Sequence, residues 1–256
     1  MKIWAISDLH LCTTDPEKKM DRFGENWIEH PTNIYNNWKS VVGDNDIVLI
    51  PGDICWALKF DNGLQELRYL QDLPGIKVFS KGNHDYWWKS IKNLRMNAPD
   101  RMYFINNDAL TLDINGYRIG IGGTRLWHYD LISWPCVLRN EELNELAKDK
   151  EPVDLKWLAK MRKREIERLE FSLKQIPDDT YKIAMVHYPP YAEDGKSTPI
   201  TTIMTKYNIR NCVFGHLHSV QGNPKTANWM IDKTSYHLVS SDYLKFTPKL
   251  VMRSEE

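Results

Sequence analysis

The segment Ile47-Val48-Leu49-Ile50-Pro51-Gly52-Asp53 is a short apolar run that leads directly into a glycine and a carboxylate. Such runs are typical of buried strands in an α/β sheet, and ligands collect at the carboxyl ends of these strands. The same pattern recurs at residues 2–10, 76–85 and 212–218, and residues 183–187 repeat it without the glycine. The sequence therefore predicts an α/β fold that gathers metal-binding side chains at one edge of its sheet.

Length and charge are those of an ordinary globular protein. A chain of 256 residues with 42% apolar content can form one large α/β domain, and we expect residues 1–256 to be a single domain. Lysine plus arginine and aspartate plus glutamate both total 34, so the formal net charge is zero. This balance disfavours a protein that holds nucleic acid mainly by counterion release.

We expect a cytoplasmic protein that does not span a membrane. The first predicted strand begins at the N-terminus and leaves no room for a secretory signal. No apolar run approaches the roughly 18 residues that suggest a membrane span. The four cysteines are far apart and form no Cys-x-x-Cys pair, which favours reduced thiols over a disulfide framework or a zinc ribbon.

Between the apolar runs, the pattern predicts helices and one hairpin. Leucines at threefold spacing predict a helix over residues 63–72, and a second helix is expected directly after Asp85 through about Asn97. Residues 13–37 are expected to form helix with irregular connections. Asn115-Gly116 is a typical turn between strands at residues 109–114 and 117–121. Further strands are expected near Lys182, Cys212, Tyr236 and Lys249.

Residues 125–177 are rich in charge and in helix-forming residues, and we expect them to form a helical insert. A long surface helix is predicted between Asp154 and Pro177, because apolar residues recur there at steps of three and four. Glutamates, including Glu165, alternate with the basic residues 162–164, which indicates a solvated face. The predicted apolar stripe consists of Leu155, Ala159, Ile166, Leu169, Leu173 and Ile176.

The side chains after the strands have the composition of a two-metal site. Two divalent metals held close together need a shared oxygen ligand, several further donors and an open position for water and substrate. Asp53 is the natural bridging carboxylate. The motifs occur in the order Asp8-x-His10, Gly52-Asp53, Gly82-Asn83-His84-Asp85, His187 and Gly215-His216-Leu217-His218.

With these motifs in this order, the chain resembles the calcineurin-like metallophosphoesterase superfamily. The resemblance implies a four-layer α/β/β/α sandwich and hydrolysis of a phosphate ester. It also implies the ligands of the two metals: Asp8, His10 and His218 for one, Asn83, His187 and His216 for the other, and Asp53 as the bridge.

The predicted ligand set also indicates which metals and substrates it suits. A shell of imidazole, carboxylate and amide without thiolate suits Mn²⁺, Fe²⁺, Zn²⁺ or Co²⁺, and Mn²⁺ is our working choice. Two divalent ions outweigh the charge of the two aspartates, so the centre is net positive and suits a phosphate ester. A hydroxide that bridges the metals is then oriented for in-line attack on phosphorus.

His84 is the candidate catalytic residue, since it follows a ligand and the resemblance places it facing the phosphoryl group. Asp85 is expected to orient the turn or neighbouring groups. Gly52, Gly82 and Gly215 each precede a ligand, where a missing Cβ permits a sharp turn and close backbone approach.

One position departs from the family pattern. Family members commonly carry Gly-Asp-x-x-Asp or Glu at the second motif, where the second acid helps orient the catalytic histidine. Here the sequence reads Gly52-Asp53-Ile54-Cys55-Trp56, and a tryptophan cannot replace a carboxylate. We therefore expect His84 to lack its usual partner, without any effect on metal binding.

Residues outside the motifs have simpler interpretations. His30, His128 and His237 are expected to be surface or packed residues. Trp87 and Trp88 follow the Asn83 motif and are expected to pack beneath the site. The alternative for these two tryptophans, and for Trp127 and Trp134, is stacking on a nucleobase or an aromatic leaving group.

The leading interpretation is a metal-dependent phosphoesterase that acts on a small, for example nucleotide-like, phosphodiester or phosphomonoester. We favour the diester, because the arginine-rich motifs of the related Ser/Thr phosphatases are absent. A nuclease uses the same metal chemistry, but the neutral charge and the lack of an evident DNA-binding module disfavour it. A catalytically silent scaffold would retain the fold, and the intact ligand set disfavours that alternative.

Overall fold

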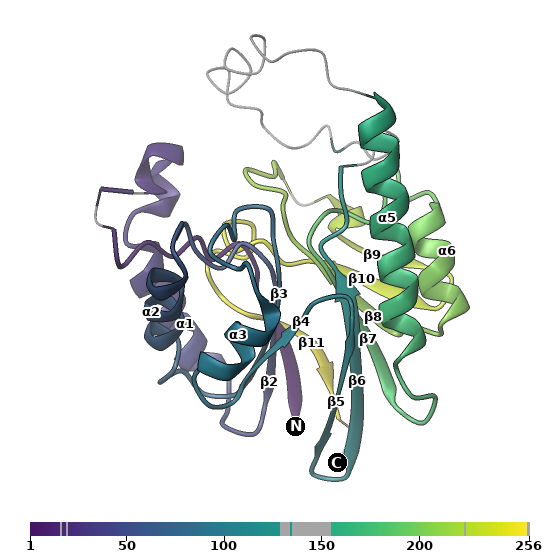
Figure 1. Cartoon of the computed structure of the whole chain (residues 1–256), viewed down its shortest axis with the longest axis horizontal. Helices are drawn as coiled ribbons and strands as arrows, with labels where there is room; N and C mark the ends of the chain where they lie inside the picture. The colour runs from purple at the N-terminus through teal and green to yellow at the C-terminus, as the bar shows by residue number, and fades with distance from the viewer. Residues whose placement is uncertain (16, 19, 129–133, 135–154, 223, 255–256) are drawn as a thin grey trace.

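The computed structural model describes residues 1–256 with the exception of residues 16, 19, 129–133, 135–154, 223 and 255–256. Among the described residues the strands form two sheets (Figure 1). The first sheet has the order β11-β1-β2-β3-β4, in which β1 to β4 are parallel and β11 is antiparallel to β1. Its strands are β1 (Lys2–Ala5), β2 (Ile47–Pro51), β3 (Ile76–Ser80), β4 (Met102–Ile105) and β11 (Lys249–Arg253).

The second sheet has the order β5-β6-β7-β8-β10-β9, with a parallel centre of β6, β7, β8 and β10. The antiparallel hairpin of β5 and β6 turns at Asn115 and Gly116, which both have positive φ, so the predicted turn is confirmed. The strands are β5 (Ala109–Ile114), β6 (Tyr117–Thr124), β7 (Tyr181–Val186), β8 (Asn211–Phe214), β9 (Asn228–Ile231) and β10 (Thr234–Leu238).

Helices cover the outer face of each sheet, so the predicted four-layer α/β/β/α sandwich is confirmed (Figure 1). On the side of the first sheet lie α1 (His30–Val41), α2 (Phe60–Tyr69) and α3 (Ile91–Asn97). On the side of the second sheet lie α5 (Leu155–Lys174) and α6 (Pro199–Lys206). Short 3₁₀ helices are η1 (Met20–Phe23), η2 (Glu25–Trp27) and η3 (Lys225–Ala227).

Both faces of the strands are buried, which explains their continuous apolar runs. In β1, Ile3 and Ala5 face the second sheet, whereas Trp4 packs on the helical side. In β2, Leu49 joins the core between the sheets and Ile50 joins the core under the helices. Successive side chains of a strand point to opposite faces, so each short apolar run contributes side chains both to the core between the sheets and to the core under the helices.

The helix predicted directly after Asp85 begins later than expected. Residues 86–88 form a turn instead, in which the amide of Tyr86 donates to the carbonyl of His84 and that of Trp88 donates to the carbonyl of Asp85. The helix begins only after Ser90, whose hydroxyl accepts from the amide of Asn93. The turn keeps Asp85 beside the strand ends, and this tertiary role overrides the local helix preference.

The long surface helix is confirmed as α5, but its predicted apolar stripe is wrong in the first half. Leu155 is 72% exposed and Ala159 is also exposed, whereas Met161 and Glu165 are buried. Glu165, expected on the solvated face, accepts a hydrogen bond from Thr124 at 2.8 Å and pairs with Arg168 at 2.7 Å. Thr124 and Arg168 therefore stabilise the buried carboxylate of Glu165, whereas the periodicity of the helix predicts that this side chain is exposed to solvent.

The part of the predicted helical insert that precedes α5, residues 125–154, lies largely outside the described residues. Within the described residues, no helix has the length and apolar character of a membrane-spanning segment.

Candidate metal centre

The loops that carry the predicted ligands meet where the two sheets are joined. Just beyond β1, the amide of Ser7 donates to the carbonyl of Val239 at 2.7 Å, and the amide of Ser241 donates to the carbonyl of Ser7 at 3.0 Å. These hydrogen bonds connect the carboxyl end of β1 in the first sheet to that of β10 in the second. The candidate ligands therefore extend from both sheets toward one place.

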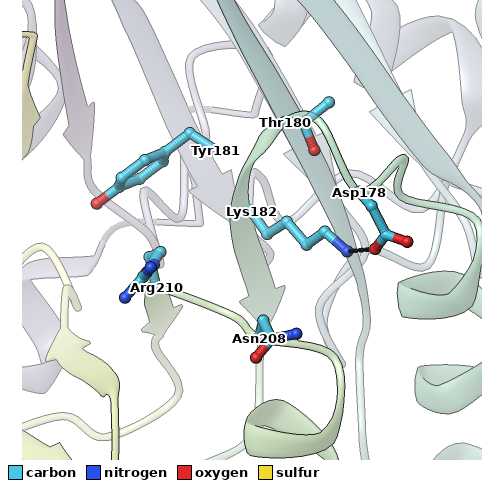
Figure 2. Close-up of a pocket in the computed structure, with 6 residues that line it drawn as sticks. All are labelled: Asp178, Thr180, Tyr181, Lys182, Asn208 and Arg210. Carbon is cyan, nitrogen blue, oxygen red and sulfur yellow. Dashed lines mark hydrogen bonds and ion pairs between the residues drawn. The ribbon is translucent and has the colours of Figure 1, made fainter.

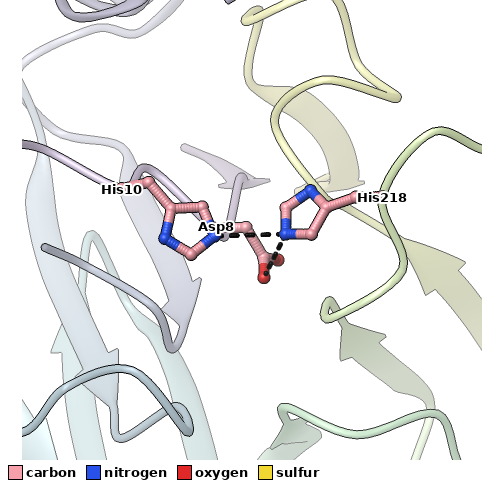
Figure 3. Close-up of side chains that lie close together, drawn as sticks. All are labelled: Asp8, His10 and His218. Atoms are coloured by element: carbon pink, nitrogen blue, oxygen red, sulfur yellow. Dashed lines mark hydrogen bonds and ion pairs between the residues drawn. The ribbon is translucent and has the colours of Figure 1, made fainter. Parts of the chain in front are cut away.

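One group of candidate ligands consists of Asp8, His10 and His218, whose ligand atoms all lie within 4.8 Å of one another (Figure 3). The Nε2 atoms of His10 and His218 are 3.1 Å apart, and Nε2 of His218 is 3.5 Å from Oδ1 of Asp8. The two rings and the carboxylate point at a common centre, although they come from loops more than 200 residues apart in the chain (Figure 3).

The second predicted group, Asn83, His187 and His216, is also brought together. The side-chain oxygen of Asn83 lies 2.7 Å from Nε2 of His187 and 3.0 Å from Nδ1 of His216. His187 belongs as well to a compact group with Asp8 and Asp53, in which the ligand atoms lie within 4.8 Å of one another. The second group is therefore continuous with the first.

Asp53 lies between the two groups, as its predicted bridging role requires. Its Oδ2 atom is 3.8 Å from Nε2 of His10 and 3.5 Å from Nε2 of His187. Its other oxygen accepts a hydrogen bond of 2.8 Å from the amide of His84. Because the amide of His84 binds Oδ1 of Asp53, Oδ2 faces both groups of candidate ligands.

The backbone of the ligand loops is unusual. Asp8, His10, Asp53 and His216 have φ values of 55°, 45°, 53° and 72°. Non-glycine residues rarely adopt positive φ, and such conformations cluster at functional sites because the surrounding structure must enforce them. The tight loops at the strand ends thus carry conformational strain at the candidate ligands.

Two glycines permit the close packing of the first-sheet loops. A Cβ on Gly52 would lie 2.6 Å from Cα of Gly82, and a Cβ on Gly82 would lie 2.1 Å from Oδ1 of Asp53. Any larger residue would push the β2 and β3 loops apart. The close backbone approach predicted for these glycines is confirmed.

Asp85 organises the same loops through its buried carboxylate. It accepts hydrogen bonds from the amides of Asp53 at 3.0 Å, Ile54 at 2.9 Å and Gly82 at 2.8 Å. The indole of Trp87 donates to it as well, at 3.2 Å. Asp85 therefore joins the second and third motifs, which confirms its predicted orienting role.

Two supporting residues were not predicted from the sequence. Asp242 accepts from Nδ1 of His218 at 3.0 Å and from the amide of Ser219 at 2.8 Å, so it directs Nε2 of His218 to the centre. His30, which is buried as a packed residue, contacts the carbonyl of His10 at 3.2 Å through Nε2. Asp242 follows strand β10, so the pattern of a polar residue after an apolar run could have found it.

The metal-free site attracts positive charge. Burial opposes protonation of His187, yet the carboxylates of Asp53 and Asp8 raise its pKa to about 9. Burial likewise opposes protonation of His218, but hydrogen bonds to Asp242 and Asp8 raise its pKa well above the usual value. The carboxylates therefore favour a cation at these two imidazoles, whether a proton or a metal ion.

The other two imidazoles remain neutral donors. Burial lowers the pKa of His10 and of His216 to about 3. Nδ1 of His10 is buried and has no hydrogen-bond partner among the described residues. Imidazole, carboxylate and amide donors that converge in a buried centre fit divalent cations, so the residues present suit the two metals that the resemblance implies.

His84 lies beside the centre and contacts Trp56. The two rings have centroids 4.3 Å apart, and Nδ1 of His84 has no hydrogen-bond partner among the described residues. Burial lowers the pKa of His84. The expectation that Trp56 leaves His84 without a carboxylate partner agrees with this geometry, since an aromatic ring lies against the imidazole.

The tryptophans considered for stacking differ in their exposure. Trp87 and Trp88 are 0% and 2% exposed and pack in the core beneath the site, as the packing interpretation predicts, and Trp134 is also buried. Trp127 is half-buried and lies under the guanidinium of Arg125 at 4.4 Å. Trp87 and Trp88 are therefore structural residues.

Another cavity lies away from this centre. It has a volume of about 580 Å³ and is lined by Lys182, Arg210 and their neighbours (Figure 2). These residues lie at the amino-terminal ends of strands β7 and β8, whereas His187 and His216 follow the carboxyl ends of the same strands. Lys182 is paired with Asp178 at 2.6 Å (Figure 2), and the cavity has no part in the candidate metal centre.

Comparison with known families agrees with this geometry. A family model described as calcineurin-like phosphoesterase matches residues 1–220. The chain therefore belongs to the calcineurin-like phosphoesterase family, and every motif of the predicted centre lies within the matched part.

Individual relatives are distant. The chain is 33% identical over 119 residues to an uncharacterized protein of Methanocaldococcus jannaschii, a match that covers 46% of this chain and 66% of that protein. It is 33% identical over 84 residues to the gene 66 protein of Mycobacterium phage L5, covering 32% and 39% of the two chains. The chain thus spans less than two thirds of the length of these relatives.

A crystal structure of a Thermus thermophilus protein resembles the whole chain, with a TM-score of 0.51 and 13% identity over 97% of each chain. At this identity the similarity shows the fold alone, and it supports the sandwich described above.

Proposed function

We propose that this protein is a phosphohydrolase that uses two divalent metal ions, with one held by Asp8, His10 and His218, the other by Asn83, His187 and His216, and Asp53 shared. The observation that carries the proposal is the position of Asp53, whose Oδ2 atom lies 3.8 Å and 3.5 Å from one imidazole of each group. A single carboxylate oxygen between two sets of donors is what a shared ligand requires.

Two bound divalent ions supply the positive charge that activates water and stabilises the phosphoryl oxygens. The chain's own residues hold this charge in place. Asp85 and the glycines fix the loops of Asp53 and Asn83, and Asp242 directs His218. The strained, buried loops limit reorganisation during the reaction, which is how preorganised sites lower a barrier.

His84 is proposed to assist by hydrogen bonding to the phosphoryl group or the leaving oxygen. Its backbone amide holds Asp53, and its ring lies at the edge of the centre, 5.6 Å from the ring of His10 between centroids. With Trp56 in place of a carboxylate partner, we assign the neutral ring a positioning and donor role rather than that of a strong acid.

The proposed substrate is a small phosphate ester, with a phosphodiester favoured over a monoester and Mn²⁺ as the working metal. The absence of arginine-rich phosphatase motifs supports the diester. The cytoplasmic location and the single-domain organisation expected from the sequence stay predictions.

The first experiment is hydrolysis of bis(p-nitrophenyl) phosphate and of p-nitrophenyl phosphate by metal-stripped protein reconstituted with Mn²⁺. Asp53→Asn is the blank, because it removes the shared negative charge and retains the shape of the side chain. We expect manganese-dependent diester cleavage that the variant loses. Preference for the monoester would overturn the diester assignment. Two bound metals without hydrolysis of any ester tested would favour the scaffold.

Single-stranded and duplex DNA in the same assay test the nuclease alternative. Cleavage of either DNA at a rate above that of the small diester would replace the proposed substrate class.

His84→Ala should separate catalysis from metal binding. Because the ring is not among the predicted ligands, we expect turnover to fall roughly 10²- to 10⁴-fold, with bound manganese still near two per chain by elemental analysis. Loss of both metals in this variant would contradict the division of roles. His128→Ala is the matched control, since His128 is exposed and lies outside the motifs.

A further inference from the structure

Beside the metal centre lies a small recess of about 230 Å³, lined by Lys18, Met20, Arg22, Phe23 and Trp56. Its lining contains none of the predicted metal ligands. An apolar cavity of about 150 Å³ can hold a benzene molecule, so the recess is large enough for one flat aromatic ring.

Trp56 forms the wall between this recess and the centre. Its ring stacks on that of His10, with centroids 5.0 Å apart and an angle of 22° between the planes, and it also contacts His84. Its position is held by polar contacts: the indole donates to the sulfur of Met20 at 3.0 Å, and Lys18 donates to its carbonyl at 3.3 Å. The recess is therefore separated from His10, a predicted metal ligand, by the ring of Trp56.

The rings of Phe23 and Trp56 lie parallel to each other in this recess. Their planes are parallel within 3° and their centroids are 6.5 Å apart. Phe23 lies on the short helix η1, next to Arg22, and its side chain is 42% exposed. The exposed ring of Phe23 is thus accessible to a ligand, and aromatic side chains with a few polar groups are the usual lining of small-molecule sites.

Two cations complete the recess. Lys18 and Arg22 line it together with the aromatic rings, and Lys18 is also paired with Asp15 at 3.8 Å, so the recess combines a stacking surface with the guanidinium of Arg22. This combination favours an electron-rich or anionic aromatic group over a plain alkyl chain.

We infer that the recess binds an aromatic ring in the alcohol part of the phosphate ester, so that the protein selects aryl or nucleoside-like esters over small aliphatic ones. The ring stacks on Phe23 and contacts Trp56 while the phosphoryl group lies at the metals. Phe23 determines specificity and takes no part in the reaction. This inference rests on the proposed function, since it places the phosphate at the metal centre.

The test compares the binding of three phosphonates, which cannot be hydrolysed, to manganese-loaded protein by isothermal titration calorimetry. Phenylpropylphosphonate and propylphosphonate differ only in the ring, and cyclohexylpropylphosphonate replaces the flat ring by a saturated one. The variants are Phe23→Ala and the matched control Phe171→Ala, whose ring is 63% exposed on α5 at the other outer layer.

We expect the phenyl compound to bind roughly tenfold more tightly than the propyl compound and several-fold more tightly than the cyclohexyl compound, as one stacked ring contributes in nucleic-acid recognition. Phe23→Ala should reduce the phenyl preference to about twofold or less, while Phe171→Ala leaves it unchanged.

Equal affinity for the phenyl and propyl compounds, or a preference that Phe23→Ala does not reduce, would overturn the inference and leave the proposed function intact. Equal binding of the phenyl and cyclohexyl compounds would overturn the aromatic specificity. If manganese itself does not bind, the proposed function fails and the inference fails with it.

Discussion

The loops of the two sheets contribute to the centre in different ways. Those of the first sheet supply the oxygen donors and His10, and they are held by the close approach of Gly52 to Gly82 and by the amides around Asp85. Those of the second sheet supply three imidazoles, the imidazole half of the centre. Nδ1 of His187 donates to the carbonyl of Pro51 at 2.9 Å and Nδ1 of His218 donates to Asp242 at 3.0 Å, whereas Nδ1 of His216 faces Asn83. Backbone packing and several amides position the first-sheet loops, whereas single polar contacts position two rings of the imidazole half.

This difference predicts how substitutions act. Changes in the first-sheet loops should disrupt folding and metal binding together, because the loops are packed backbone to backbone. Changes in the second-sheet supports should mainly lower metal affinity, because each support acts on one ring.

The largest effect is expected for Gly82→Ala. The added Cβ would lie 2.1 Å from Oδ1 and 2.2 Å from the amide nitrogen of Asp53, so the loops must separate. We expect loss of both metals by elemental analysis and a stability loss on the order of 3 kcal/mol by urea unfolding. Gly43→Ala is the control, because its Cβ makes an ordinary contact of 3.5 Å. Full metal content in Gly82→Ala would show that the packing is not essential.

Asp85→Asn should have the next largest effect. The new amide group would place donor hydrogens against the amides of Gly82, Asp53 and Ile54 and leave some of them unsatisfied. We expect a loss on the order of 3 kcal/mol in metal-free protein, measured by urea unfolding. Asp113→Asn at an exposed position should change stability by less than about 0.5 kcal/mol. If Asp85→Asn were as stable as this control, the amides around Asp85 would not be what holds the first-sheet loops.

The imidazole half should make the metal-free protein sensitive to pH. The pKa of His187 is raised from 6.5 to about 9 in the folded state, so protonation stabilises the fold fully below pH 6.5, and this stability is lost as the pH rises through 9. We expect a loss on the order of 3 kcal/mol across this window. Manganese should remove the dependence, because the metal replaces the proton.

His187→Gln is the reference for this pH measurement. Burial lowers the pKa of Lys77 to about 8, which gives stability the opposite slope above pH 8, and this contribution cancels in the difference between wild type and variant. Unfolding free energies that run parallel in the two proteins from pH 6 to 9 would exclude His187 as the titrating group.

The smallest effect is expected for Asp242→Ala. The substitution leaves Nδ1 of His218 and the amide of Ser219 without their acceptor. We expect metal affinity to fall about 10- to 100-fold, measured by competition with a chelator. Asp242→Asn retains an acceptor oxygen and should lose less. Unchanged affinity in Asp242→Ala would mean that the imidazole half does not depend on its polar supports.

Much of the centre could be predicted because its signals are local. A strand that is buried on both faces needs a continuous apolar run, and Asp53 and His187 directly follow such runs. The roles of Gly52 and Gly82 were also predictable from local sequence, because a tight turn directly before a ligand leaves no room for a Cβ. Periodicity failed in α5, because Thr124 and Arg168 stabilise Glu165 in a buried position that the helix sequence does not reveal.

The sequence by itself determined the strands that carry the motifs, the order of these motifs and the candidate ligands, because strand burial and ligand chemistry are properties of short segments. Strands β4 and β9 were not predicted. Only the tertiary structure decided that Asp53 lies between the two groups, that Asp242 directs His218, and that Trp56 separates the centre from a recess beside Phe23. These relations join loops from both sheets, and the distances between such loops depend on how the sheets pack against each other.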